Sequence, residues 1–197
     1  MLNSSRLSCW VANSETPFAV ALAVDHDTTL NPMTKENTTA ESSITREQMI
    51  QLLNEDLAGE YQAIIAYTVY SQVLKGAAYT DIARELETHA VEELAHAIRI
   101  AKQIDYLGGM PGVTPKPVKT SNDPIAILRA DLENERTTVG RYRERICQAE
   151  AMGEFALSET LRTIIVQEQE HEIDLAAALG IEVPPAIPPV DGRKGQL

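Results

Sequence analysis

The chain has 197 residues, enough for one domain with a sizeable hydrophobic core. Its 29 acidic and 17 basic residues give a formal net charge of -12, which disfavours binding to nucleic acid and to anionic membranes. The two cysteines form neither a disulfide framework nor a zinc-binding pattern, and no apolar run is long enough for a membrane helix. These features predict a cytoplasmic globular protein.

Residues 1–42 are rich in Ser, Thr and Asn and have no sustained hydrophobic period, which predicts a disordered leader. The apolar stretch at residues 17–24 is a poor signal-peptide core, because a single Arg precedes it and Glu15 interrupts the run. Met33 offers an alternative translation start, just before the polar segment that leads into the first predicted helix.

Four helical segments follow, at about residues 45–75, 80–107, 124–152 and 154–178. Thr45 and Gln48 have the spacing of a capping box at the first start. Asp123 is a candidate cap for the third helix, with Pro124 at its first position. The tail after Gly180, residues 181–197, is Pro-rich and cannot continue a helix.

The connections between the helices indicate the architecture. Residues 108–122 form a long link between the second and third helices, whereas the other links are short. Three of the helices would each be about 40 Å long. We therefore predict an all-α fold, in which residues 43–180 form a four-helix bundle with a long crossover between helices 2 and 3.

The second helix pair repeats the first with an offset of 75 residues. The matching polar pairs are Glu60 and Glu135, Tyr67 and Tyr142, Glu93 and Glu168, and His96 and His171. Each helix pair is therefore one structural unit that the chain uses twice. If a two-fold axis relates the units, the equivalent residues meet at the centre of the bundle.

A Glu interrupts the apolar stripe of every predicted helix near its middle. In the second and fourth helices a His follows that Glu at i+3, on the same face. The candidate metal-binding and catalytic residues are Glu60, Glu93, His96, Glu135, Glu168 and His171.

Four uncompensated carboxylates in an apolar core would be strongly destabilising. Two divalent cations would balance their four negative charges. A ligand set rich in oxygen with two imidazoles suits iron or manganese better than a structural zinc site, which favours thiolates. The alternative is a metal-free bundle in which these groups are protonated and hydrogen-bonded.

Other polar residues on the same faces have less certain roles. Tyr67 and Tyr142 are candidates to hydrogen-bond the ligands or to supply single electrons, and core packing explains them equally well. His89 lies one turn before Glu93, either as an outer ligand or as a hydrogen-bonded core histidine. Asp56 and Asp131 are candidate partners of the ligating histidines.

Five segments within residues 46–179 resemble bacterioferritins and their Dps-like relatives in the ferritin-like superfamily: "LNEDLAGEYQAIIAY", "HAVEELAHAIR", "YLGGMPG", "LRADLENE" and "QEQEHEIDL". The resemblance implies a ferritin-like four-helix bundle with a di-iron site inside each subunit. It assigns Glu60 and His96 to one iron, Glu135 and His171 to the other, and Glu93 and Glu168 to both. Tyr67 occupies the place of the tyrosine beside the bacterioferritin site.

The chain departs from bacterioferritins at two positions that bear on haem and assembly. Leu94 stands where they carry the haem-binding Met, so haem is not expected. The Pro-rich tail replaces their short fifth helix, which favours a homo-oligomeric shell of twelve subunits over one of 24. The tails are not Lys-rich, unlike those of DNA-binding Dps proteins, so DNA binding is not expected either.

The resemblance implies a ferroxidase that oxidises Fe(II) with O2 or H2O2 for iron storage or detoxification. It implies two iron ions per subunit, with manganese or zinc as substitutes. A rubrerythrin-like di-iron peroxidase without storage is the alternative enzyme, although the chain lacks the Cys-x-x-Cys module that rubrerythrins usually carry. A non-enzymatic helical interaction protein, whose polar core fixes helix register, is a third hypothesis.

Overall fold

The computed structural model describes residues 44–183 and contains four long helices: α1, Arg46–Val73; α2, Thr80–Tyr106; α3, Pro124–Ala151; and α4, Phe155–Ala178. A short 3-10 helix, η1, spans Ala77–Tyr79, and there is no strand within residues 44–183. The all-α prediction is confirmed, with helix ends within about two residues of those expected. The predictions for residues 1–42 and for most of the 181–197 tail lie outside the described residues.

Local capping explains where two of these helices begin. The Thr45 side chain accepts a hydrogen bond from the backbone N–H of Gln48, and the Gln48 side chain accepts one from the Thr45 backbone N–H, which confirms the predicted capping box. Asp123 accepts a hydrogen bond from the backbone N–H of Ile125 at the start of α3, with Pro124 at the first helical position.

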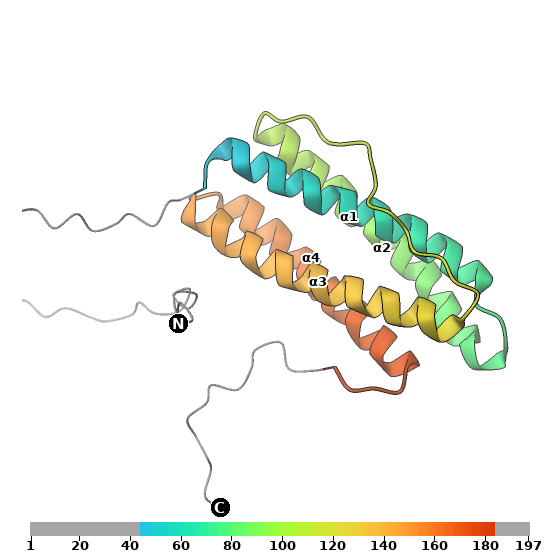
Figure 1. The fold of residues 1–197 in the computed structure, drawn as a ribbon. Coiled ribbons are helices and arrows are strands. Elements are labelled where there is room, and N and C mark those ends of the chain that lie inside the picture. The colour runs from blue at the N-terminus through green and yellow to red at the C-terminus, as the bar shows by residue number, and fades with distance from the viewer. Residues whose placement is uncertain (1–43, 184–197) are drawn as a thin grey trace, which may run out of the picture. The chain divides into compact units, whose positions relative to one another are not determined.

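The helices pack as two antiparallel pairs, α1 with α2 and α3 with α4, that lie against each other (Figure 1). The crossover between α2 and α3 runs along α1 (Figure 1). Asn54 of α1 accepts a hydrogen bond from the backbone N–H of Gly112, at 2.6 Å. Further along, the backbone N–H of Lys116 donates to the carbonyl of Ala58, at 2.9 Å. These bonds attach the crossover to α1, although the crossover has no secondary structure of its own.

The bundle core consists of two apolar clusters. Along α1, residues up to Leu57 belong to one cluster and residues from Ala66 onwards to the other. Buried polar residues from all four helices lie between the two clusters, including Glu60, Glu93 and Glu135. No helix among the described residues is long and apolar enough to cross a membrane.

Candidate metal centre

All six predicted ligands lie in the buried polar layer, with exposed fractions between 0% and 3%: Glu60, Glu93, His96, Glu135, Glu168 and His171. Every helix contributes one Glu, and α2 and α4 each add a His one turn later. The apolar stripe of each helix therefore carries its Glu into the centre of the bundle, as the sequence predicts.

The six residues form two groups of four that share two members. Each residue offers one ligand atom, and the atoms of a group all lie within 4.8 Å of one another. Glu93 and Glu168 belong to both groups. Glu60 and His96 complete one group, and Glu135 and His171 complete the other. This arrangement suits two neighbouring cations bridged by two carboxylates.

His96 Nδ1 lies close to three carboxylates. It is 3.0 Å from Glu168 Oε1, 3.2 Å from Glu93 Oε2 and 3.5 Å from Glu60 Oε2. His171 Nδ1 faces the same layer and lies 3.0 Å from Glu93 Oε1. Both histidines therefore point Nδ1 towards the shared carboxylates.

Several buried atoms of this layer make no hydrogen bond of suitable geometry, although most of them face another charged group of the layer at ion-pair distance. They are one oxygen on each of the four glutamates and the Nδ1 atom of His171. Buried polar atoms are rarely left without a partner, because each one costs free energy. Converging atoms of these types fit a divalent cation, since carboxylate oxygen and imidazole nitrogen are common ligands of iron and manganese.

The outward nitrogens of the two histidines are held by residues that sequence reasoning missed. His96 Nε2 lies 3.0 Å from Gln167 Oε1, and His171 Nε2 lies 2.9 Å from Glu92 Oε2. Gln167 also donates to Glu92, at 3.1 Å. Gln167 follows Glu92 by 75 residues, so the repeat already paired the two positions. Such partners orient a ligating imidazole and fix its tautomer.

Each predicted tyrosine donates a hydrogen bond to a glutamate of the opposite helix. Tyr67 of α1 donates to Glu135, and Tyr142 of α3 donates to Glu60. Burial, followed by the charges of nearby carboxylates, raises the pKa of both phenols well above 10.0. Both tyrosines therefore stay protonated donors that fix the two unshared carboxyl groups.

The prediction that Asp56 and Asp131 bind the histidines is wrong. Asp56, fully buried, pairs with Arg145 at 2.8 Å, and Arg145 is only 4% exposed. Asp131 Oδ2 has no hydrogen-bond partner within the described chain, and burial raises the Asp131 pKa to about 8. Asp56 therefore forms a buried ion pair with Arg145, a residue that the helical periodicity did not place in the core.

Before metal binds, Glu60 and His96 form an ion pair. Burial raises the Glu60 pKa, but hydrogen bonds with His96 and Glu93 lower it below 4.5 overall. Burial lowers the His96 pKa, but hydrogen bonds with carboxylates, that of Glu168 foremost, raise it far above 6.5 overall. Glu60 is therefore ionised and His96 protonated at neutral pH.

The pKa values of the other three carboxyl groups are raised. Burial, then the charge of Glu60, raises the Glu93 pKa well above 4.5. Burial, then the charge of Glu168, does the same for the Glu135 pKa. Burial, then the charge of Glu93, raises the Glu168 pKa to about 8. Burial and mutual repulsion therefore both favour the neutral forms of these three carboxyl groups.

A cavity of about 110 Å³ reaches the four glutamates between α1 and α3. Lys116 of the crossover and Arg141 of α3 also line this cavity, together with Asp131. Small molecules can therefore approach the shared carboxylates from the α1–α3 side.

His89 lies beside this layer but belongs to neither group of four. It is 2% exposed, and burial, then the nearby His171, lowers its pKa to about 3. Its imidazole is therefore neutral at physiological pH.

Comparison with known proteins supports the fold and the type of site. The family model for ferritin, described as a ferritin-like domain, matches residues 50–181. A bacterioferritin of Brucella melitensis is 25% identical over 142 residues, which cover 68% of this chain and 88% of that protein. A ferritin-like, diiron-carboxylate protein from Bacillus anthracis is 33% identical with a TM-score of 0.66, over 68% of this chain and 96% of that one. A dodecameric thioferritin from Bacteroides fragilis is 30% identical with a TM-score of 0.65, over 70% and 88%.

Proposed function

Because this chain belongs to the ferritin family of ferritin-like domains, we propose that it is a ferroxidase for iron storage or detoxification. One observation carries the proposal: two buried groups of four ligands share Glu93 and Glu168. Such shared carboxylates hold two metal ions close enough to act on one oxidant molecule.

In this proposal two Fe(II) substrates each bind one Glu and one His, and two further glutamates bridge them. Glu60 and His96 would bind one ion, and Glu135 and His171 would bind the other. Glu93 and Glu168 would bridge the two ions. Each Fe(II) would give up one electron and become Fe(III), and the two electrons, with two protons from solvent, would reduce H2O2 to two water molecules or O2 to H2O2.

The protein contributes position and charge. Tyr67 and Tyr142 fix the unshared carboxyl groups through hydrogen bonds, and Glu92 and Gln167 orient the two imidazoles. The apolar clusters on both sides of the polar layer limit the access of water. Zinc and manganese fit the same oxygen and nitrogen donors and are expected as substitutes for iron.

Three finer points stay predictions. A shell of twelve subunits is supported by the similarity to a dodecameric thioferritin. Haem is not expected, because Leu94 has no atom that could bind its iron. The expected location is the cytoplasm.

Measurement of Fe(II) oxidation by stopped-flow absorbance tests the proposed site. Glu93→Ala and His96→Ala are expected to slow the reaction more than about a hundredfold, since loss of a residue that only supports a ligand already costs 10–100-fold. Glu87→Ala removes an exposed carboxylate from the same helix and is expected to keep the parent rate. Circular dichroism checks that all three variants keep the helical bundle. If Glu93→Ala and His96→Ala both oxidise iron at the parent rate, the site assignment is wrong.

Iron loading separates storage from peroxidase activity. Storage requires hundreds of iron ions per particle and a shell visible by electron microscopy. A small oligomer that holds about two iron ions per chain and turns over H2O2 would instead support the rubrerythrin-like alternative.

A further inference from the structure

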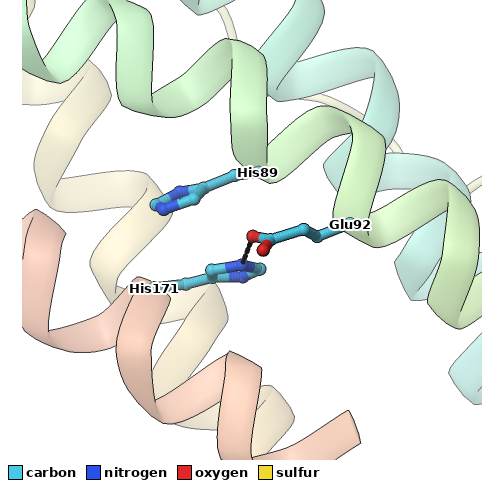
Figure 2. A group of neighbouring side chains, drawn as sticks. All are labelled: His89, Glu92 and His171. Atoms are coloured by element: carbon cyan, nitrogen blue, oxygen red, sulfur yellow. Dashed lines mark hydrogen bonds and ion pairs between the residues drawn. The ribbon is translucent and has the colours of Figure 1, made fainter.

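The buried His89 lies next to the six-residue site, with two partly exposed carboxylates beside it. The His89 ring faces the His171 ring, with 4.0 Å between ring centroids and 31° between ring planes (Figure 2). Glu92 contacts His171 from the same side (Figure 2). His89 is therefore next to a proposed ligand while its own nitrogens stay outside the six-residue site.

Two half-exposed carboxylates converge on His89. Asp174 Oδ2 of α4 lies 3.3 Å from His89 Nε2, and its side chain is 42% exposed. Glu85 Oε1, one turn before His89 on α2, lies 3.9 Å from the same nitrogen and is 49% exposed. The three donor atoms lie within 4.8 Å of one another, so they can surround one ion that arrives from solvent.

Packing alone does not explain a histidine at this position. The repeat offset of 75 residues places Ile164 at the equivalent position of α4, where it is fully buried. The bundle therefore accepts an aliphatic side chain there. His89 instead leaves a buried Nδ1 without a hydrogen-bond partner, a cost that an aliphatic side chain would not have, while its Nε2 faces the two carboxylates.

No cation of the described chain neutralises the two carboxylates. Neither Glu85 nor Asp174 forms an ion pair with Lys or Arg in residues 44–183. Two carboxylates and one imidazole without a basic partner are a ligand set for a first-row divalent cation.

We propose that Glu85, His89 and Asp174 bind a third divalent cation, of the Fe(II) class, on the α2–α4 side of the bundle. Three protein ligands leave coordination positions for water, so this ion exchanges with solvent more readily than the buried pair. Because the His89 ring packs against His171, this ion would lie next to the dinuclear site. The cavity between α1 and α3 reaches the dinuclear site from a different side.

Anaerobic Co(II) titration of the full chain, by equilibrium dialysis with metal analysis, tests this site. The parent protein is expected to bind about three ions per chain, and His89→Ile about two. The substitution copies the residue at the equivalent position, Ile164, so the bundle is expected to accept it. Asp174→Asn keeps the histidine and changes only a half-exposed carboxylate, and it is expected to weaken the third ion at least about tenfold.

Controls separate this site from the dinuclear one. Glu159→Gln removes an exposed charge elsewhere on α4 and is expected to leave all ions in place. Glu93→Ala is expected to lose the tightly bound pair of ions and keep the third ion. The third site can therefore be tested even if the proposed ferroxidase site is wrong. In crystals soaked with Co(II), the anomalous signal is expected beside His89 Nε2.

Two results would overturn the proposal. One is a parent protein that binds only about two ions per chain. The other is a third ion whose affinity is the same in the parent, His89→Ile and Asp174→Asn.

Discussion

Loading of the six-residue site with two divalent cations at pH 7 is expected to release about four protons per chain. Before metal binds, their raised pKa values keep protons on Glu93, Glu135 and Glu168. His96 carries a further proton, because its pKa lies far above 6.5. All four groups must lose these protons, since carboxylate and neutral imidazole are the forms that bind metal. Two cations are thus expected to replace about four protons.

The same protons determine how metal affinity depends on pH. Because protons compete with the cations, the product of the two binding constants rises with pH, by about 10⁴ per pH unit where four protons are displaced. Above the Glu168 pKa of about 8, that group is already ionised. Release then falls to about three protons, and the pH dependence becomes shallower.

Isothermal titration calorimetry with Zn(II) measures this release. The apparent heat of binding varies linearly with the ionisation enthalpy of the buffer, and the slope is the number of protons released per chain. Data over the first two equivalents give the value for the dinuclear pair. A slope of fewer than about two protons would refute the reasoning, because the carboxyl groups would then be ionised before metal binds.

Two variants serve as controls for this measurement. Glu159→Gln, on an exposed part of α4, is expected to keep the release of about four protons. Glu93→Ala removes a shared carboxyl group and is expected to lose most of the release together with the tight pair. If Glu93→Ala released as many protons as the parent, the metal ions would bind elsewhere.

Residues around the site give three further predictions. Arg145→Ala removes the nearest partner of the buried Asp56 carboxylate, leaves only Arg141 at 3.8 Å, and is expected to lower the free energy of unfolding by up to about 3–5 kcal/mol in urea titration. Arg162→Ala, whose side chain is 52% exposed, is expected to cost less than about 1 kcal/mol, and equal costs would contradict this account. Because the folded-state Asp131 pKa of about 8 exceeds the ordinary value of 3.8 for an aspartate, parent stability is expected to fall as pH rises from about 4 through 8. Urea titrations at acidic and at alkaline pH measure this fall in the free energy of unfolding, and Asp131→Asn is expected to reduce it by up to about 5 kcal/mol. If the fall is the same in Asp131→Asn, other groups cause it. Glu92→Gln gives His171 an amide partner and is expected to weaken one metal ion about 10–100-fold in Co(II) titration, whereas equal affinities would show that the carboxylate has no such role.

Local sequence signals predicted the helices and the ligand layer because both depend on short-range patterns. The capping box at Thr45 and the Pro124 start are each contained within four residues. The apolar period of each helix decides which face is buried, so a Glu on that stripe must enter the core. The repeat then brought the two halves of the ligand set together.

Contacts that cross between helices were less predictable. Arg145 and Asp56 are 89 residues apart, so no local pattern pairs them, and the sequence instead suggested the ligating histidines as the partners of Asp56. Glu92 is next to Glu93, but the helical turn of about 100° per residue sends its side chain to another face, where it meets His171 of α4. The packing of α2 against α4, and the side-chain rotamers, decide these pairs.

The repeat also explains how two similar metal positions come to differ. Duplication of a helix pair supplies equal ligands to both halves, which the matched tyrosine–glutamate bonds of Tyr67 and Tyr142 still reflect. The halves diverge one layer further out, where His171 has the carboxylate of Glu92 as its partner and His96 has an amide. The two proposed metal positions therefore have different surroundings beyond their ligands, since such partners orient an imidazole and fix its tautomer. The chain places His89 against this same histidine, and the equivalent residue of α4 is an isoleucine that has no donor atom for a metal. The difference between His89 and Ile164 therefore gives only the α2–α4 side with His171 the histidine on which the proposed third cation depends.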